Sequence, residues 1–269
     1  MTELVDLQSG GKWLWRNHQV PLGSIPSGAV YDDVWQGGLE ELFPNDAPAI
    51  VDDSSYPDHG ELWSVPWQVV RTKEGAIELA VEGAATGVRI CKRFSINFAE
   101  LTVRYAFEHS GRIPLLHLFK LHAAIDVNTH CQINLPGGVV EKVDHEFGNL
   151  LSTADEQPWP TEVGLPFCCD RSSRSNEFVY VSDLPEGWCG ITENKAGSWV
   201  RIDYPTDVFP YCWIFMTYGG REHNVVVLEP CTNYPKDLEK ATSNGTATLL
   251  APATTREFEV TVSVGSVNE

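Results

Sequence analysis

Short segments in which hydrophobic and polar residues alternate recur along most of the chain. Every second position of 76–81 is strongly apolar, and the segments 87–98 and 101–107 repeat the pattern. A period of two places neighbouring side chains on opposite faces of a β-strand, so each segment is predicted to be a strand. The short segment 97–100, which joins two of them, is predicted to be a hairpin connection.

Similar hydrophobic segments continue towards the C-terminal end of the chain. They predict strands over 178–181, 198–202, 213–217, 225–228, 247–250 and 257–264. Only the segment from about 235 to 242 is predicted to be helical, with Thr232 or Asn233 as its N-cap and Gly245 beyond its end. Many strands with almost no helix predict an all-β fold, either an antiparallel sandwich or a barrel.

The strand pattern runs through the chain without an internal repeat, a low-complexity tract or a long linker. A chain of 269 residues is long enough for one large all-β domain or for two small ones. Because no segment separates two halves, we expect a single domain over 1–269.

The charge balance narrows the classes of partner. The chain has 37 acidic and 19 basic residues, which gives a formal net charge of -18 at pH 7. Nucleic acid and anionic membrane surfaces are bound through clustered Lys and Arg, so neither is expected as a partner. A strongly anionic substrate is also disfavoured, although an acidic balance mainly reflects solubility. With 42% hydrophobic and 21% charged residues, the composition is that of a globular protein.

Cysteine usage and the first residues bear on the compartment. Residues 1–11 contain acidic and polar side chains and no long hydrophobic run, so neither a secretory signal nor a membrane span is expected there. The seven cysteines include no C-x-x-C pair and are odd in number, which suits neither disulfides nor a zinc site. We therefore expect reduced thiols and a cytoplasmic protein, and the oligomeric state stays open.

One carboxylate occupies an unusual place in this pattern. The aliphatic segment 225–228 is followed directly by Glu229 and then by Pro230. An ionised carboxylate taken out of water is costly unless its pKa changes, and the proline favours extended geometry at Glu229. The pattern predicts a strand that ends on a buried glutamate with a raised pKa, which suits a general base. The alternative is a glutamate buried in a structural salt bridge.

Two further segments place histidines in special surroundings. His59 lies between turn residues and tryptophans in 56–67, where aromatic faces beside a polar turn suit stacking on a sugar ring. The alternative there is a loop histidine beside core tryptophans. In the apolar segment 115–126, His117 and His122 need partners or a cavity. We assign His117 a structural role and expect no shared metal site, because the two histidines fall on opposite faces of a strand.

Taken in order, these segments resemble the aldose 1-epimerase (mutarotase) family and its galactose mutarotase-like relatives. The segment 33–45, which contains G-G-L-E-E-L-F-P, is similar to an early segment of the family, and the H-G pair at 59–60 is similar to its H-G motif. Tyr105 and His122 are similar to residues on a pair of family strands, and the E-P pair at 229–230 to the segment that carries the family's base. The resemblance extends from about residue 35 to the C-terminus.

The resemblance implies a β-supersandwich of two large, mostly antiparallel sheets, with a sugar bound in a concave groove. It implies that Glu229 is the general base that takes a proton from the anomeric hydroxyl, that His122 is the acid that protonates the ring oxygen, and that His59 positions the substrate. It implies neither a cofactor nor a metal. Independently of the family, a carboxylate and an imidazole can open a hemiacetal by acid–base chemistry near neutral pH.

The expected substrate contacts are less well defined. Many family members carry an arginine beside the F-P letters or after the H-G letters, and this chain has none in either place. The candidate substrate-binding residues are Trp35, Gln36, Trp63, Asp203 and Trp213, with Glu193 as the alternative to Asp203 for an acidic contact. The predicted activity is an isomerase of the aldose 1-epimerase type acting on an uncharged or lightly substituted sugar. The alternatives are a carbohydrate-binding or regulatory protein without turnover, and a lyase or isomerase acting on an unusual sugar.

Overall fold

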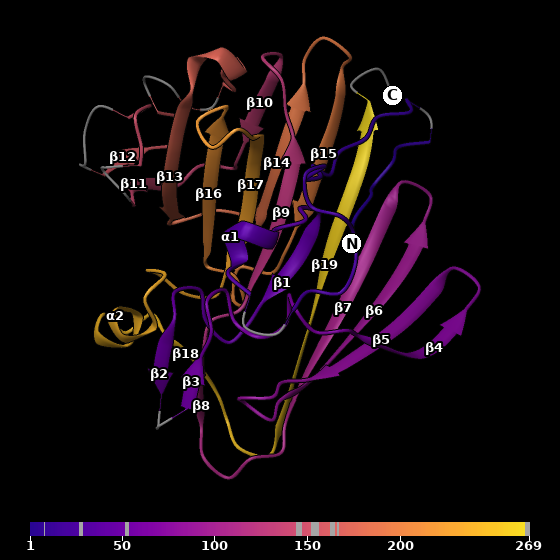
Figure 1. Ribbon diagram of the computed structural model, residues 1–269, viewed down its shortest axis with the longest axis vertical. Helices are drawn as coiled ribbons and strands as arrows, with labels where there is room; N and C mark the ends of the chain where they lie inside the picture. The colour runs from indigo at the N-terminus through magenta and orange to yellow at the C-terminus, as the bar shows by residue number, and fades with distance from the viewer. Residues whose placement is uncertain are drawn as a thin grey trace.

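The computed structural model describes residues 1–7, 9–26, 29–51, 54–143, 147–151, 156–161, 165 and 167–266. Within these ranges the chain forms two large antiparallel sheets that pack face to face (Figure 1). The predicted all-β sandwich of two antiparallel sheets is therefore confirmed. In the described part of the chain, no helix is long and apolar enough to cross a membrane.

Seven strands of the described residues form the first large sheet. In spatial order they are β1 (Leu39–Leu42), β9 (Lys120–Asp126), β17 (Asn224–Cys231), β16 (Tyr211–Tyr218), β13 (Ser175–Ser182), β11 (Val139–Lys142) and β12 (Gln157–Pro158). The central strands β9, β17 and β16 are almost completely buried, since each is covered on both faces.

Eight strands of the described residues form the second large sheet. In spatial order they are β10 (Cys131–Asn134), β14 (Trp188–Glu193), β15 (Ser198–Asp203), β19 (Thr254–Ser266), β7 (Glu100–His109), β6 (Arg89–Asn97), β5 (Ala76–Glu82) and β4 (Gln68–Lys73). The strands β4 to β6 extend to one side of the seven-stranded sheet, at the right of Figure 1.

Smaller elements flank the two sheets. Two short ladders pair β18 (Thr248–Leu250) with β8 (Leu115–His117) and β2 (Ala49–Val51) with β3 (Ser54–Tyr56). The helices are α1 (Tyr31–Val34), α2 (Leu238–Ser243) and the 3-10 turn η1 (Arg171–Ser173). The α1 turn lies over the seven-stranded sheet in Figure 1, and its Tyr31 side chain is buried there.

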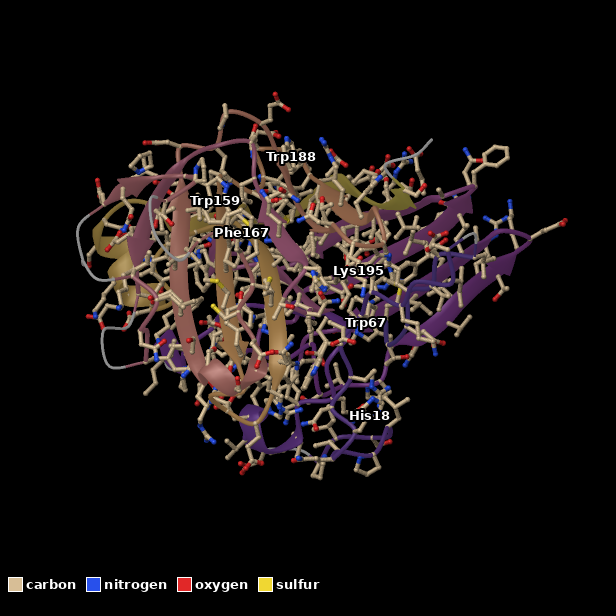
Figure 2. All side chains as sticks on the ribbon, turned by 90° about the horizontal axis from the view of Figure 1, so that it is seen from above. His18, Trp67, Trp159, Phe167, Trp188 and Lys195 are labelled. Carbon is tan, nitrogen blue, oxygen red and sulfur yellow. The ribbon has the colours of Figure 1, made fainter. Side chains whose placement is uncertain are left out.

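The main core lies between the two large sheets. It is built from alternate side chains, such as Ile214 and Met216 of β16 and Val200 and Ile202 of β15. Figure 2 shows the side chains of both sheets from above, and the labelled Trp67 packs against this core. The intervening residues of the seven-stranded sheet face the other way, and some of them are polar. The outer face of that sheet therefore differs in chemistry from the core.

The strands predicted from alternation are present with small shifts of their ends, and the hairpin at 97–100 joins β6 to β7. The predicted N-terminal end of the helix is wrong. The α2 helix begins at Leu238 because Asp237, and neither Thr232 nor Asn233, caps it. The Asp237 side chain accepts a hydrogen bond from a backbone N–H in the first turn, which is the usual function of an N-cap residue.

The predicted end of the Glu229 strand is also wrong. The strand continues as β17 to Cys231, and Pro230 pairs in register with Cys212 of β16. On the other side, the pairing with β9 is recorded up to Leu228 and again at Cys231, but not between them. Because proline has no N–H to donate, a break in the ladder at this point is expected. Glu229 thus lies beside an interruption in a central ladder instead of at a strand end.

Candidate active site

The outer face of the seven-stranded sheet holds a pocket of about 740 Å³. Two neighbouring strands supply its polar floor. Lys120 and His122 are two residues apart on β9, so both side chains face the pocket, and Glu229 lies opposite them on β17. The α1 turn contributes Tyr31 to the wall of the pocket. The sheet topology thus brings together side chains from separate parts of the sequence.

The carboxylate of Glu229 is buried, with 2% of its surface exposed. Its Oε2 atom contacts the Lys120 ammonium group, and its Oε1 atom lies 3.8 Å from Nε2 of His122. Burial raises the pKa of Glu229, Lys120 opposes this rise, and the nearby Asp46 carboxylate adds to it. The expected rise in pKa is present, and so is the salt bridge that was the alternative explanation. Glu229 is both paired and oriented towards the pocket.

Lys120 is the cation at the centre of the floor. Its ammonium group contacts Glu229, lies 2.8 Å from Oδ1 of Asp46, and lies 4.5 Å from the ring centroid of Trp213. Burial alone would lower the pKa of Lys120, but the two carboxylates outweigh it and hold the pKa above its usual range. The lysine is therefore charged, and it balances part of the negative charge of the two acids.

The imidazole of His122 is the second group of the predicted acid–base pair. Its Nε2 atom faces Glu229, and its Nδ1 atom lies 3.2 Å from the hydroxyl oxygen of Tyr31. Burial lowers the pKa of His122 well below its usual range, and the charges on Lys120 and His59 lower it further. The ring is therefore neutral at physiological pH, with one nitrogen protonated and the other free to accept.

His59 completes the set of predicted catalytic residues. Its ring stacks on Tyr31 with centroids 3.8 Å apart and an angle of 5° between the planes, and its centroid lies 6.4 Å from that of His122. The following residue, Gly60, has φ +74°, and a Cβ there would lie 2.2 Å from the carbonyl oxygen of Phe43. Only glycine allows this approach, which fixes the His59 turn against the end of β1.

The structure gives different positions to the five predicted substrate-binding residues. Trp35 lines the pocket, with its ring centroid 5.5 Å from that of His122. Trp63 packs edge-on against Tyr31 behind the wall, and Trp213 is fully buried beneath Lys120. These three tryptophans therefore surround the site, although Trp35 alone among them is part of the pocket lining.

The other two predicted contacts are outside the pocket lining. Asp203 lies on β15 of the eight-stranded sheet and forms an ion pair with Arg201 at 2.6 Å, so its assignment as a substrate contact is corrected. Its strand belongs to the eight-stranded sheet and not to the sheet that carries the pocket, which the periodicity of a single sequence could not reveal. The side-chain amide of Gln36 donates to the carbonyl oxygen of Gly23. The Gln36 side chain is therefore hydrogen-bonded to the loop that contains Gly23.

Several lining residues were not predicted from the sequence. They include Tyr31, Asp46, Arg221, His223 and Lys236. The pocket therefore has cationic groups, although none comes from the segments where many family members carry an arginine. Arg221 lies in the turn that follows β16 and forms an ion pair with Asp32 at 2.6 Å. Nothing in the local pattern distinguishes such a turn residue from an ordinary solvated arginine.

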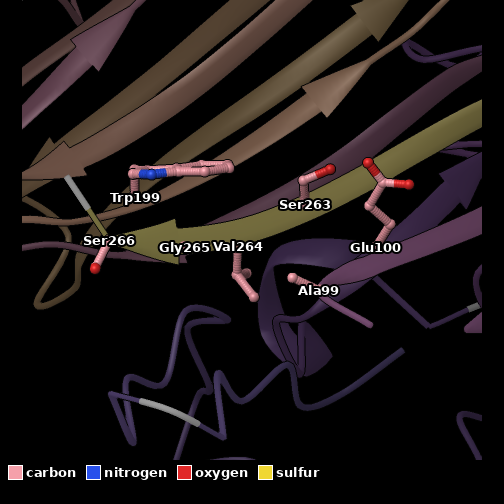
Figure 3. Close-up of a pocket in the computed structure, with 7 residues that line it drawn as sticks. All are labelled: Ala99, Glu100, Trp199, Ser263, Val264, Gly265 and Ser266. Atoms are coloured by element: carbon pink, nitrogen blue, oxygen red, sulfur yellow. The ribbon is translucent and has the colours of Figure 1, made fainter. Parts of the chain in front are cut away.

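A second hollow in the described part of the chain lacks this combination of groups. The hollow in Figure 3, at the ends of β15 and β19, has Glu100 as its titratable residue and is otherwise lined by small residues and Trp199. Among the residues that the structure describes, no cluster of three or more His, Cys, Asp or Glu is placed to hold a metal ion. His117 is buried in β8, where burial lowers its pKa to about 4. It is therefore separate from His122 on β9.

Comparison with known proteins agrees with this architecture. No protein-family model and no curated protein sequence matches the chain. Among solved structures, the galactose mutarotase related enzyme from Lactobacillus acidophilus superposes with a TM-score of 0.72 at 11% identity, over 98% of this chain and 91% of that one.

Two further solved structures are similar over most of their length. A galactose mutarotase-like protein from Lactobacillus casei gives a TM-score of 0.70 at 13% identity, over 98% of this chain and 93% of that chain. A galactose mutarotase-like protein from Clostridium acetobutylicum gives 0.66 at 13% identity, over 99% and 89%. The chain therefore has the galactose mutarotase-like fold. Similarity at this level of identity establishes the fold, and function must be argued from the site.

Glu40 lies behind the pocket lining and has an unusual pKa. The hydroxyl oxygen of Tyr31 lies within hydrogen-bond distance of its Oε2 atom, at 2.7 Å, and burial raises the pKa of Glu40 to about 7. The folded protein keeps this proton between pH 4.5 and 7, where the unfolded chain releases it. Stability from this group therefore falls as pH rises through that window, and the full loss is present above pH 7.

We expect Glu40→Gln to remove this pH dependence. Relative to the wild type, the free energy of unfolding of the variant should rise by about 3 kcal/mol between pH values below 4.5 and above 7. Urea denaturation across this range measures it. The control is Glu41→Gln. The Lys92 ammonium overcomes burial and lowers the pKa of Glu41, so the stability difference of this variant should change in the opposite direction, and it should do so below pH 4.5. A stability difference for Glu40→Gln that does not change with pH contradicts the prediction.

Proposed function

We propose that this protein is an isomerase of the aldose 1-epimerase type, which interconverts the α and β anomers of a sugar by acid–base ring opening. The observation that carries the proposal is the pairing of Oε1 of Glu229 with Nε2 of His122, 3.8 Å apart in one pocket. A carboxylate and an imidazole at this spacing can reach two adjacent oxygens of one sugar ring. The fold shared with mutarotase-like proteins supports the same chemistry.

In the proposed reaction, the Glu229 carboxylate takes the proton from the anomeric hydroxyl while His122 gives a proton from Nε2 to the ring oxygen. The bond between C1 and the ring oxygen breaks, and a C1 carbonyl forms. Rotation about the C1–C2 bond presents the other carbonyl face, and the reverse proton transfers close the ring. Each positioned acid or base typically contributes about 10²- to 10⁴-fold to the rate.

The remaining groups support binding and orientation. Lys120 occupies Oε2 of Glu229, which leaves Oε1 on the His122 side available to the substrate. Trp35, Phe178 and Phe215 supply aromatic faces in the lining, and such faces stack on the apolar side of a sugar ring. We assign His59 the role of positioning the substrate near the ring oxygen. The substrate class proposed is an uncharged or lightly substituted hexose or pentose.

The proposal includes a cytoplasmic location. All seven cysteines are free thiols, and four of them, Cys131, Cys189, Cys212 and Cys231, are almost completely buried. Thiols that remain reduced are typical of a reducing compartment. The binding partner that we propose is a small-molecule carbohydrate, and neither nucleic acid nor a membrane.

The proposal is tested by measuring the anomerisation of freshly dissolved α-sugars by polarimetry and by proton NMR exchange. We expect the purified protein to accelerate the approach to anomeric equilibrium for at least one sugar of a broad hexose and pentose panel. Acceleration of none, together with detectable sugar binding, would replace the enzyme by a carbohydrate-binding protein. New products in the NMR spectrum would instead favour a lyase or a different isomerase.

A further inference from the structure

Glu40 and His122 are direct partners in the ladder between β1 and β9. Their side chains lie on the outer face of the sheet, with Oε2 of Glu40 4.0 Å from Nδ1 of His122. That distance is too long for a hydrogen bond. The Tyr31 hydroxyl bridges them, at 2.7 Å from the carboxylate and 3.2 Å from the imidazole nitrogen. A continuous chain of hydrogen-bonding groups therefore connects Glu40 to His122.

Tyr31 is held firmly in the bridging position. Its side chain is buried, one face stacks on His59, and the ring contacts Trp63 edge-on with centroids 4.9 Å apart. The Tyr31 ring has little room to turn away, because neighbours pack on more than one side of it. The hydroxyl is therefore fixed between its two partners, as a group that passes protons must be.

Because His122 is neutral, it needs a proton at Nδ1 when it gives its Nε2 proton to the sugar, and this chain can supply that proton. A neutral imidazole that gives up its Nε2 proton becomes an anion unless its Nδ1 atom gains a proton in the same step. The Tyr31 hydroxyl is placed to supply that proton to Nδ1. The hydroxyl must then regain one, and the carboxyl group of Glu40 is the group bonded to it.

We propose that Glu40 is the source of the proton that reaches the ring oxygen, and that Tyr31 and His122 relay it. This inference rests on the proposed function and specifies its acid. In the opening step, the Glu40 carboxyl protonates the Tyr31 oxygen, the Tyr31 hydroxyl proton moves to Nδ1 of His122, and the Nε2 proton moves to the ring oxygen. Glu229 takes the anomeric proton at the same time.

The proton balance of this step is complete. Glu40 becomes a carboxylate and Glu229 becomes a carboxylic acid, so the net charge of the site does not change. Tyr31 and His122 end neutral, with His122 changed from the Nε2–H to the Nδ1–H tautomer. Ring closure on the other face returns each proton along the same path. The relay therefore needs no external acid, base or cofactor.

The surroundings of Glu40 suit this role. Burial raises its pKa to about 7, and the charged and titratable groups near enough to influence it are Tyr31, His59, His122, the Met1 amino group and the neighbouring Glu41. The Glu41 side chain points the other way, to Lys92 and Tyr105. Near neutral pH, both the protonated and the ionised form of Glu40 are therefore accessible, as a proton donor that is regenerated in each cycle requires.

The relay is tested with Glu40→Gln and Tyr31→Phe, measured by kcat for anomerisation. Each variant keeps the packing but removes a transferable proton, and each should lower kcat by about 10²- to 10⁴-fold while sugar binding is retained. The double variant should be no slower than the single ones, since residues that act as one unit are not additive. Glu41→Gln, on the same strand but facing the other sheet, should retain its kcat.

Two readouts distinguish a relay from a structural role. In the wild type, kcat should fall as pH rises through about 7, where Glu40 loses its proton, and this fall should be absent in Glu40→Gln. Nitrogen NMR shifts of His122 should show a change from the Nε2–H to the Nδ1–H tautomer over the same range. The tautomer measurement uses the wild-type protein, so it decides the question even if a variant does not fold.

The outcomes separate this inference from the proposed function. If the wild type anomerises a sugar but Glu40→Gln keeps its kcat and pH profile, or the His122 tautomer does not respond to pH, the relay is overturned and the epimerase proposal stands. If the wild type anomerises no sugar of the panel, both proposals are overturned.

Discussion

Replacing Glu229 by glutamine is expected to lower kcat for anomerisation by about 10²- to 10⁴-fold while sugar binding is preserved. The amide has nearly the shape of the carboxylate but cannot accept the proton of the anomeric hydroxyl. It also remains within reach of Lys120, with which the carboxylate now pairs. Exchange NMR gives the rate, and titration calorimetry gives the affinity for the sugar.

A matched control for this variant exists elsewhere in the same sheet. Glu177 of β13 is also fully buried and lies 3.5 Å from a buried lysine, Lys142, but it is not part of the pocket lining. Glu177→Gln removes a comparable buried carboxylate, so it should alter stability without a specific loss of kcat in the folded protein. Unchanged activity in Glu229→Gln would show that Glu229 is not the base.

Replacing Lys120 by methionine is expected to destabilise the protein by about 3–5 kcal/mol, because it leaves the carboxylates of Asp46 and Glu229 buried without their cation. Activity should fall as well, because the pKa of an uncompensated Glu229 rises further and more of the protein then has Glu229 already protonated at neutral pH, where it cannot take the anomeric proton. Urea denaturation and exchange NMR measure the two effects.

A second substitution tests whether charge is the cause. Lys120→Met combined with Asp46→Asn removes one buried negative charge together with the positive one, so it should recover part of the lost stability. A double variant as unstable as the single one would assign the loss to packing against Trp213 instead. A Lys120→Met variant as stable as the wild type would contradict the electrostatic account altogether.

Much of the fold could be predicted from alternation alone. The segment 101–107 alternates clearly because one face of β7 is buried, and β7 extends it only to Glu100–His109. The central strand β17 was harder to delimit, because Pro230 suggested an end where the strand continues. One neighbouring strand keeps its pairing there, and sequence alone does not show which side of a strand is paired.

The site could be predicted only in part, for reasons of geometry. Glu229, His122 and His59 drew attention because charged or polar groups stand out in apolar or turn segments, and the fold brings all three to one pocket. Tyr31 carries no such signal, since a tyrosine in a short turn is ordinary. Asp203 was expected to contact the substrate but lies in the eight-stranded sheet, because periodicity gives the facing of a side chain within a strand but not the sheet to which the strand belongs.

A crystal structure of Glu229→Gln with a bound sugar tests the central claim most directly, because slow turnover preserves the substrate. The account predicts that the anomeric oxygen lies about 2.6–3.2 Å from the side chain at position 229, and that the ring oxygen lies at a similar distance from Nε2 of His122. A sugar bound outside this pocket, or bound within it with its C1 and ring oxygen turned away from both groups, would contradict the account.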